Sequence, residues 1–429
     1  MMLLTTTSNS PRARAVQFFL RWRAFQAFLV ILIFLNLLAF LPPRTYATNF
    51  EQEAQTRPSN LSAAHEARQH IGRVFIASLL KDNEDLLKGG WSDAVVNLTR
   101  ALGPENVWVS IHESGSRDGT KRELQVLDLK LSALGVGHKI NMGDIGQEMD
   151  DIIPEDGPGW ITAEGRRLMR RIPWLAGLRN KSIEPLTDLV ANNVTFDKIL
   201  FLNDIIFTSD DALELLGTRD GDYAAACGFD YSRPWPTAAF YDQFATRDSS
   251  GQELISLYHP YFAEGRSRDA MLQGSLVPAK SCWSGIAAFD AAPFQNLQHP
   301  LRFRAVNDSL AEYFLEASEC CLIHYDNPLS IFKGVWMNPK VRVGYNGERY
   351  DAVHRPQNWP STTETTLGLV TRVFARILQL TPRPKLIDQR YDEWAEKSMY
   401  HTEIGSDCLV NKMMVVSGKG QWSAVRESS

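Results

Sequence analysis

Short apolar runs alternate with amphipathic stretches from about residue 66 onward. Residues 107–111, 136–140, 198–203 and 223–228 are rich in β-branched, aromatic or small apolar side chains, which is typical of buried strands. Between the first two runs, leucines recur at helical spacing up to a glycine, and an aspartate can cap the helix that they predict. This alternation predicts an α/β fold with a mostly parallel sheet and helices on both faces.

Two further helices are expected between the later strands. The pattern predicts a short helix over residues 210–216, which Asp210 and Asp211 can cap. A longer helical pattern covers residues 166–190 and is interrupted at Pro173 and Pro185. Residues 351–429 lose the alternation, so we expect them to pack as a C-terminal extension of the main domain.

The hydrophobic pattern is different at the amino terminus. Residues 24–41 carry no charge, and eighteen helical residues span about 27 Å, enough for a thin bilayer. Four arginines precede this segment and only Arg44 follows closely, which favours a cytosolic N-terminus and translocation of the rest of the chain. A cleaved signal peptide is the alternative, although residues 42–44 offer no small-residue cleavage site.

These patterns predict five segments. We expect a cytosolic tail over 1–23, one transmembrane signal anchor over 24–41, a polar stem over 42–65, a folded domain over 66–350 and the extension over 351–429. Glycosylation sequons fit a luminal domain and lie at Asn60, Asn97, Asn180, Asn193 and Asn307.

Composition excludes several classes of protein. With 44% hydrophobic and 22% charged residues, the chain is neither disordered nor collagen-like. A formal net charge of −5 argues against a general nucleic-acid binder. The five cysteines show no CxxC spacing, which argues against a structural zinc site, and their odd number leaves a thiol after at most two internal bridges.

Polar residues follow three of the predicted strands. Residues 110–118 combine hydroxyls, Gly115 and Arg117, which suit a nucleotide, although a plain βα turn explains them equally well. Asn203 and Asp204 follow the next strand and offer the hard oxygen ligands of Mg²⁺ or Mn²⁺, although an ordinary Asn-Asp turn is a common alternative. Residues 281–289 place Trp283 and Gly285 before an apolar run, which suits a sugar-binding wall or a buried core.

Taken in order, these blocks resemble the GT-A glycosyltransferase pattern. More closely, they resemble the fungal capsule-associated family of cryptococcal α-1,3-mannosyltransferases, from about His65 to Tyr345. The resemblance rests on residues 110–120, 179–180, 201–205, 222–230, 241–248, 278–285, 302–304, 318–320 and 338–342.

The resemblance implies a type II Golgi membrane enzyme whose luminal catalytic domain has a GT-A-like fold. Such an enzyme moves mannose from GDP-mannose to a mannoside or other glycan acceptor, usually with Mn²⁺ or Mg²⁺, and has no nucleic-acid partner. The chain departs from the family pattern at two positions. Asn203 stands where many GT-A enzymes have Asp, and Ser284 stands where the family pattern has Asn.

The resemblance assigns roles to individual residues. For the donor nucleotide these are Ser110, His112, Glu113, Ser114, Gly115, Ser116, Arg117, Arg179 and Asn203. The sugar and acceptor wall comprises Ser281, Trp283, Ser284 and Gly285. The resemblance places Asn203 and Asp204 at the metal-diphosphate position. Apart from the resemblance, Asp222 is a reserve metal ligand and His324 a further candidate.

The catalytic candidates are Asp204, Glu319 and Asp326. Glu319 can simply pair with Arg302 or Arg304, and His324 can be a core histidine. Two other functions remain open: an inactive luminal binding or scaffold protein, which Asn203 favours, and a glycoside hydrolase, for which no carboxylate pair stands out.

Overall fold

The computed structural model describes residue 23 and the chain from 71 to 425, except for residues 144–151, 164, 233–237, 264, 355–358, 379–382 and 418–420. The tail, the predicted anchor over 24–41 and the stem therefore lie outside the described residues, apart from Arg23. Among the residues that are described, no helix combines the length and apolar character needed to cross a bilayer.

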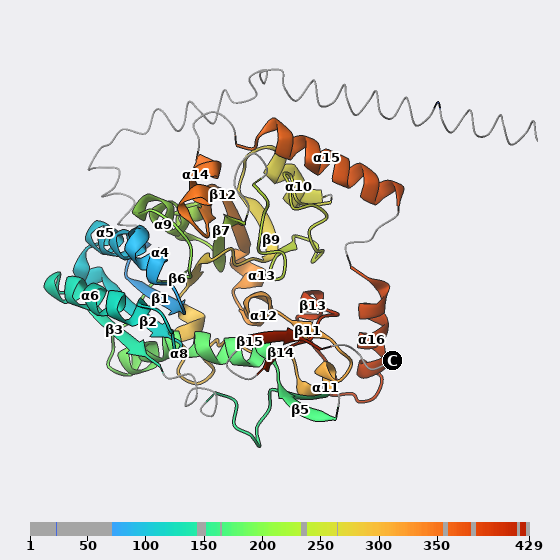
Figure 1. Cartoon of the computed structure of the whole chain (residues 1–429), viewed down its shortest axis with the longest axis horizontal. Coiled ribbons are helices and arrows are strands. Elements are labelled where there is room, and N and C mark those ends of the chain that lie inside the picture. The colour runs from blue at the N-terminus through green and yellow to red at the C-terminus, as the bar shows by residue number, and fades with distance from the viewer. Residues whose placement is uncertain are drawn as a thin grey trace, which may run out of the picture.

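A nine-stranded sheet forms the centre of the described chain (Figure 1), in the order β3-β2-β1-β6-β10-β7-β12-β9-β8. Its strands are β1 (Val74–Leu80), β2 (Val107–Glu113), β3 (Gly137–Met142), β6 (Lys198–Leu202), β7 (Ala225–Tyr231), β8 (Arg247–Asp248), β9 (Val277–Ser281), β10 (Ile286–Asp290) and β12 (Val335–Gly344). Strands β1, β2, β3 and β6 pair in parallel, as do β7 and β12, whereas β10 is antiparallel to both β6 and β7. The sheet is therefore mostly parallel, as the alternation predicts.

Both faces of the sheet are buried. In β6, Leu200 and Leu202 join the hydrophobic cluster formed with helices α5 (Ser92–Leu102), α6 (Thr120–Ala133) and α9 (Ser209–Leu216). The alternate residues Ile199 and Phe201 join the cluster formed with α8 (Arg171–Ala191) and α12 (Glu319–Asp326). Coverage on both sides explains why this strand reads as a continuous apolar run.

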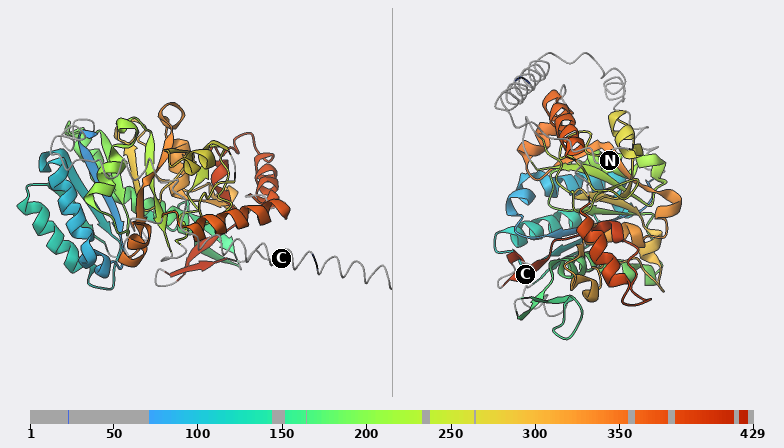
Figure 2. Two further views of the ribbon diagram at one scale, coloured as in Figure 1. Left: turned by 90° about the horizontal axis from the view of Figure 1, so that it is seen from above. Right: turned by 90° about the vertical axis from the view of Figure 1, so that its right-hand side faces the viewer.

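The remaining helices are short or lie toward the C-terminus. They are α4 (Glu84–Leu86), α10 (Gly265–Leu272), α11 (Asp308–Ala311), α13 (Ser330–Lys333), α14 (Gly347–His354), α15 (Thr362–Ile377) and α16 (Lys385–Ala395). Helices α15 and α16 lie at the opposite end of the molecule from α5 and α6 (Figures 1 and 2).

The predicted helix over 166–190 is wrong at its start. Residues Arg166–Met169 form strand β5, which pairs with β4 (Trp160–Ala163), and helix α8 begins only at Arg171. Pro173 therefore lies in the first turn of α8, where a missing N–H breaks no hydrogen bond. Pro185 lies inside the helix, which continues past it.

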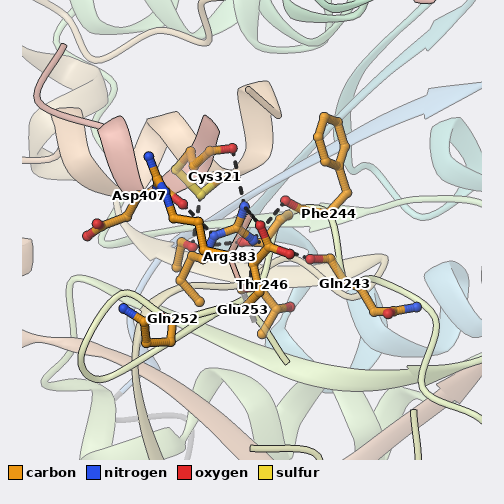
Figure 3. Close-up of polar contacts among 12 residues, drawn as sticks. Gln243, Phe244, Thr246, Gln252, Glu253, Cys321, Arg383 and Asp407 are labelled. Carbon is orange, nitrogen blue, oxygen red and sulfur yellow. Dashed lines mark hydrogen bonds and ion pairs between the residues drawn. A yellow bond between two sulfur atoms is a disulfide. The ribbon is translucent and has the colours of Figure 1, made fainter. Parts of the chain in front are cut away.

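Two disulfides, Cys227–Cys282 and Cys321–Cys408, leave Cys320 as a buried thiol, as the odd number of cysteines requires. The second bridge ties the C-terminal extension to α12, and next to it β13 (Leu409–Val410) pairs with β11 (Glu316–Ala317). Buried Arg247 donates to the carbonyl oxygens of Asp407 and Cys408 at 2.6 and 3.2 Å. Figure 3 shows Asp407 close to Cys321 of the second bridge. A last hairpin, β14 (Met414–Ser417) with β15 (Gln421–Ala424), follows.

Candidate functional site

The carboxyl edge of the sheet gathers most of the residues that the sequence singles out. Strands β1, β2, β6, β7 and β12 end at this edge, and antiparallel β10 begins there. Asn203 donates its backbone N–H to the carbonyl of Gly285 at 2.9 Å, which joins the end of β6 to the start of β10. The predicted metal-diphosphate residues and part of the predicted sugar wall are therefore neighbours.

Asp204 offers an accessible carboxylate at the end of β6. Its side chain is exposed and makes no hydrogen bond to another residue in the part of the chain that the structure describes. The surrounding protein still removes enough water to raise the pKa of this carboxyl, an effect that the Arg179 charge partly opposes. The indole Nε1 of Trp91 donates to the Asn203 carbonyl at 3.0 Å and holds the turn that presents Asp204.

Arg179 connects this turn to helix α12. Its Nε donates to Glu319 Oε1 at 2.8 Å, and its Nη1 donates to Asn203 Oδ1 at 3.3 Å. The guanidinium also lies 4.5 Å from the centre of the Trp283 ring. Glu319 is buried and pairs with Arg179, not with Arg302 or Arg304, which were its predicted partners under the plainer reading.

Two further carboxylates, which the sequence pattern did not single out, lie at this edge. Asp230 Oδ1 accepts the backbone N–H of Asp242 at 3.1 Å, and its Oδ2 accepts the Tyr345 hydroxyl at 2.6 Å. Asp242 Oδ2 accepts the backbone N–H of Ser284 at 3.0 Å. Burial and then the neighbouring Asp242 charge raise the pKa of Asp230 to about 7, and burial also raises the pKa of Asp242.

These carboxylates could have been noticed but not placed from the sequence. Asp230 and Asp242 both lie in blocks that carry the family resemblance. Their approach depends on the loop after β7 folding back over the sheet, which no local pattern shows. They join the site because the backbone N–H of Ser284 binds Asp242 beside the β6–β10 junction.

The predicted nucleotide loop begins later than expected because β2 continues to Glu113. Ser110, His112, Glu113 and Ser114 are buried, so a nucleotide can reach only the end of the loop at Gly115, Ser116 and Arg117. Glu113 organises that end, since its carboxylate accepts the Ser116 N–H and lies 3.5 Å from Lys121 Nζ. Asp82, which follows β1, also binds this loop, since its carboxylate accepts the Arg117 N–H at 2.8 Å.

The predicted sugar wall divides into a buried half and a half at the site. Ser281 donates to the Ala245 carbonyl, and Trp283 packs among Phe201, Phe289 and Phe303 with only 3% of its surface exposed. These contacts correct the prediction for Trp283, whose ring faces are covered by protein. Ser284 and Gly285 remain beside Asn203, both with left-handed backbone.

Asp222 lies at the wrong edge of the sheet for its reserve role as a metal ligand. It precedes β7, and its carboxylate is 3.8 Å from Lys333, which also binds Asp290 opposite the first residue of β6. A five-residue strand separates that end from Asn203 by roughly 15 Å. Asp222 therefore cannot share a metal ion with Asp204.

His324 and Asp326 also lie away from the metal-diphosphate position. The buried His324 ring stacks on Phe289, its Nε2 lies 2.6 Å from the Cys282 carbonyl, and burial lowers its pKa to about 4. The nearby sulfurs of Cys227 and Cys282 form a disulfide and supply no thiolate ligand. Asp326 is seven residues beyond Glu319 on α12, about 10 Å along the helix, and pairs with Arg304.

Comparison with known proteins identifies the family. Residues 73–326, more than half of the chain, match the family described as Cryptococcal mannosyltransferase 1. The chain belongs to this family. As a cryptococcal mannosyltransferase family member it is a glycosyltransferase by class, which confirms the resemblance. Arg179, Asn203, Asp204, Asp242 and Glu319 all lie within the matched residues.

Solved glycosyltransferase structures show a weaker likeness. Mannosyltransferase PcManGT from Pyrobaculum calidifontis, in complex with GDP-Man and Mn²⁺, is 11% identical over 81% of this chain and 80% of its own, with a TM-score of 0.35. Glucosyl-3-phosphoglycerate synthase from Mycobacterium tuberculosis, with Mg²⁺ and UDP, is 13% identical over 72% and 83%, at 0.32. S. aureus TarS 1–349 with UDP-GlcNAc is 9% identical over 66% and 62%, at 0.33.

TM-scores below 0.5 mean that these three likenesses are too weak to indicate the fold or the function. A search of curated proteins finds no match to the chain. The assignment to the cryptococcal mannosyltransferase family therefore rests on the matched residues 73–326.

Proposed function

We propose that the chain transfers mannose from GDP-mannose to a mannoside acceptor and forms an α-1,3 linkage. The proposed catalytic domain spans 66–350, has a GT-A-like fold and faces the Golgi lumen behind an anchor at residues 24–41. Family membership supports the class of reaction. The observation that carries the proposal is the accessible Asp204 carboxylate, held at the carboxyl edge beside the linked side chains of Asn203, Arg179 and Glu319.

The residues at the end of β6 fit a divalent cation. Asp204 supplies a carboxylate without a protein partner among the described residues, and Asn203 supplies an amide oxygen. Hard oxygen atoms of this kind are the ligands of Mn²⁺ and Mg²⁺, which typically keep waters and substrate phosphates as their other ligands. When bound, such an ion offsets the negative charge of the departing diphosphate.

The chain's own residues position the groups that would hold the reactants. Glu113 and Asp82 fix the loop at Gly115–Arg117 on which the nucleotide would lie. Arg179 holds Asn203 in position because it binds the amide oxygen and the buried Glu319 at the same time. Asp242 fixes the Ser284 backbone next to the same junction. Rigid placement of this kind lowers the entropy cost of reaching the reactive geometry.

Asn203 also favours a second candidate, a luminal protein that binds a nucleotide sugar without transfer. The amide oxygen of Asn203 is neutral and already accepts a hydrogen bond from Arg179. A glycoside hydrolase gains no support from the Asp230–Asp242 pair, because backbone N–H groups and the Tyr345 hydroxyl occupy these carboxylates.

The test uses the full chain, solubilised in detergent, with a panel of nucleotide sugars and mannoside acceptors. We expect transfer from GDP-mannose that requires Mn²⁺ or Mg²⁺, and methylation analysis of the product should show a 1,3 linkage. Binding of GDP-mannose without transfer to any acceptor would favour the second candidate. Transfer from a different nucleotide sugar alone would overturn the proposed donor.

A further inference from the structure

A cavity lies between residues 293–304 and the end of α12. Its volume is about 400 Å³, which falls within the range of small-molecule sites. Its wall includes Pro293, His299, Arg302, Phe303, Asp326 and Pro328. We infer that this cavity, the Arg302 pocket, binds a saccharide that carries an oxyanion group, either a phosphate or a carboxylate.

Arg302 is the feature that selects an anion. Its Nη1 donates to the carbonyls of Phe294 and Leu301, and its Nη2 donates to the Thr187 hydroxyl at 3.0 Å. No carboxylate pairs with it in the described chain, and its Nε–H and one Nη2–H have no acceptor there. A guanidinium has five N–H donors, so two remain available to a ligand.

The environment of Arg302 makes an unpaired charge costly. Partial burial lowers the pKa of Arg302, and no acidic neighbour opposes that effect. Charged groups that lose water are normally paired in folded proteins. An oxyanion in the cavity would supply the missing partner and can accept two parallel N–H bonds from one guanidinium.

The other charged groups of the wall, Arg304 and Asp326, are already paired. Arg304 binds Asp326 through two hydrogen bonds of 2.7 and 2.9 Å and also binds Glu403 outside the lining. Asp326 is therefore occupied, whereas Arg302 is not. Exposed His299 adds a further polar group at the rim.

The apolar wall and the size of the cavity indicate more than a bare ion. Pro300 and Pro328 give the cavity accessible apolar surface, which suits the C–H faces of a sugar ring. The cavity is separated from the donor site because α12 carries Glu319 at one end and Asp326 at the other, about 10 Å away. The inferred ligand is therefore distinct from the donor nucleotide.

The experiment measures binding to the full chain in detergent, with GDP kept at saturation so that the donor site is filled. The probes are mannose 6-phosphate, glucuronate, neutral mannose and inorganic phosphate. Titration calorimetry measures the affinity of each. We expect mannose 6-phosphate or glucuronate to bind at least tenfold more tightly than mannose and inorganic phosphate. The stronger of the two shows which oxyanion the site prefers.

Variants then locate the site. Arg302→Gln should weaken binding at least tenfold, and Arg302→Lys should weaken it less because the charge remains. The matched control is Arg268→Gln, an arginine on α10 that already pairs with Asp269, and it should bind like the parent. Hydrogen exchange in the parent should slow at residues 293–304 on binding, which tests the site even where a variant fails to fold.

Several results would overturn the inference. Equal affinity for mannose and for the acidic sugars would show that the site does not require an oxyanion. Tighter binding of inorganic phosphate than of either acidic sugar would show that the site does not recognise the sugar. Unchanged binding in Arg302→Gln, or absent protection at 293–304, would place the ligand elsewhere. Mannosyl transfer by the parent is measured separately. Absent binding to the Arg302 pocket would therefore not contradict the proposed function, and absent transfer would not contradict the Arg302 pocket.

Discussion

Arg179 is the residue that joins the two halves of the candidate site. It binds Glu319 on α12 and Asn203 after β6, and it covers the Trp283 ring. A planar guanidinium can make both hydrogen bonds at once, whereas a lysine ammonium on a flexible stem cannot reproduce that fork. Arg179 therefore holds the Asn203 side chain, while Trp91 and Gly285 bind the Asn203 backbone.

We predict that Arg179→Lys lowers transfer about 10²-fold, because the turn that presents Asp204 loses its fixed position. Affinity for GDP without added metal should change little, since Glu113 and Asp82 hold the nucleotide loop at Gly115–Arg117. Initial rates and GDP titrations check this, with Arg268→Lys as the control. Transfer within threefold of the parent would show that Arg179 has only a structural role.

Trp283 leads to a prediction about stability. Its ring is buried against Phe201, Phe289 and Phe303, so Trp283→Ala should lower the free energy of unfolding by about 3–5 kcal/mol. Chemical denaturation measures the change, and Trp422→Ala is the control because Trp422 is 36% exposed. Parent-like stability with selective loss of transfer would instead assign the ring to the sugar.

Residue roles were predictable from the sequence only where a strand end exposes them. Asn203 and Asp204 follow an apolar run, so their position at the carboxyl edge follows from the pattern. Ser110 and His112 looked similar, but β2 continues past them and buries both. The Asp230–Asp242 pair depends on a loop that folds back over the sheet, which no periodicity reports.

At the scale of elements, the central strands and helices were predictable and the edges were not. Strand β6 and helix α9 lie within one residue of their expected bounds because burial on both faces gives a strong apolar signal. The start of α8 was misjudged because a short hairpin, β4 with β5, carries charged residues with no clear alternation. The pairing of β11 with β13 joins distant segments and is invisible locally.

Strand β11 carries a buried carboxyl that should make stability depend on pH. Burial raises the pKa of Glu316 to about 7, and the Arg170 charge only partly opposes this. The folded chain therefore holds this proton more tightly than the unfolded chain, and the stabilisation is present below about pH 4.5 and is lost as pH rises through about 7.

We predict that Glu316→Gln removes this dependence. The melting temperature of Glu316→Gln minus that of the parent should increase from pH 4.5 to pH 8, because only the parent loses stability as Glu316 ionises. Thermal melts across that range check the trend, with Glu312→Gln as a control. A constant difference across the range would show that Glu316 titrates normally in the fold.

At the scale of the whole molecule, the C-terminal extension is fastened to the main domain. The Cys321–Cys408 bridge, the β11–β13 pair and buried Arg247 all act at one place. Luminal disulfide formation fits the proposed orientation, in which residues 24–41 anchor the chain in the Golgi membrane. That orientation can be tested through the sequons.

We predict that Asn97 and Asn193 are glycosylated and that Asn180 is not. Asn97 and Asn193 are exposed, whereas the Asn180 side chain binds both the N–H and the carbonyl of Phe303 at 3.0 and 2.9 Å. Asn97→Gln and Asn193→Gln should each remove an endoglycosidase-sensitive mass, and Asn180→Gln should remove none. A parent chain without any glycan, or one extracted by alkaline carbonate, would contradict the luminal anchored orientation.

The most direct test of the account is metal-dependent transfer from GDP-mannose by the parent, Asp204→Asn and Asp222→Asn. Both substitutions replace an aspartate by asparagine, so they are chemically matched. They differ in position, because Asp204 lies at the carboxyl edge of the sheet and Asp222 at the amino edge. We predict that Asp204→Asn lowers transfer at least about 100-fold with an unchanged melting temperature, and that Asp222→Asn keeps parent activity with added Mn²⁺. Metal-dependent transfer that survives in Asp204→Asn and disappears in Asp222→Asn would contradict the account.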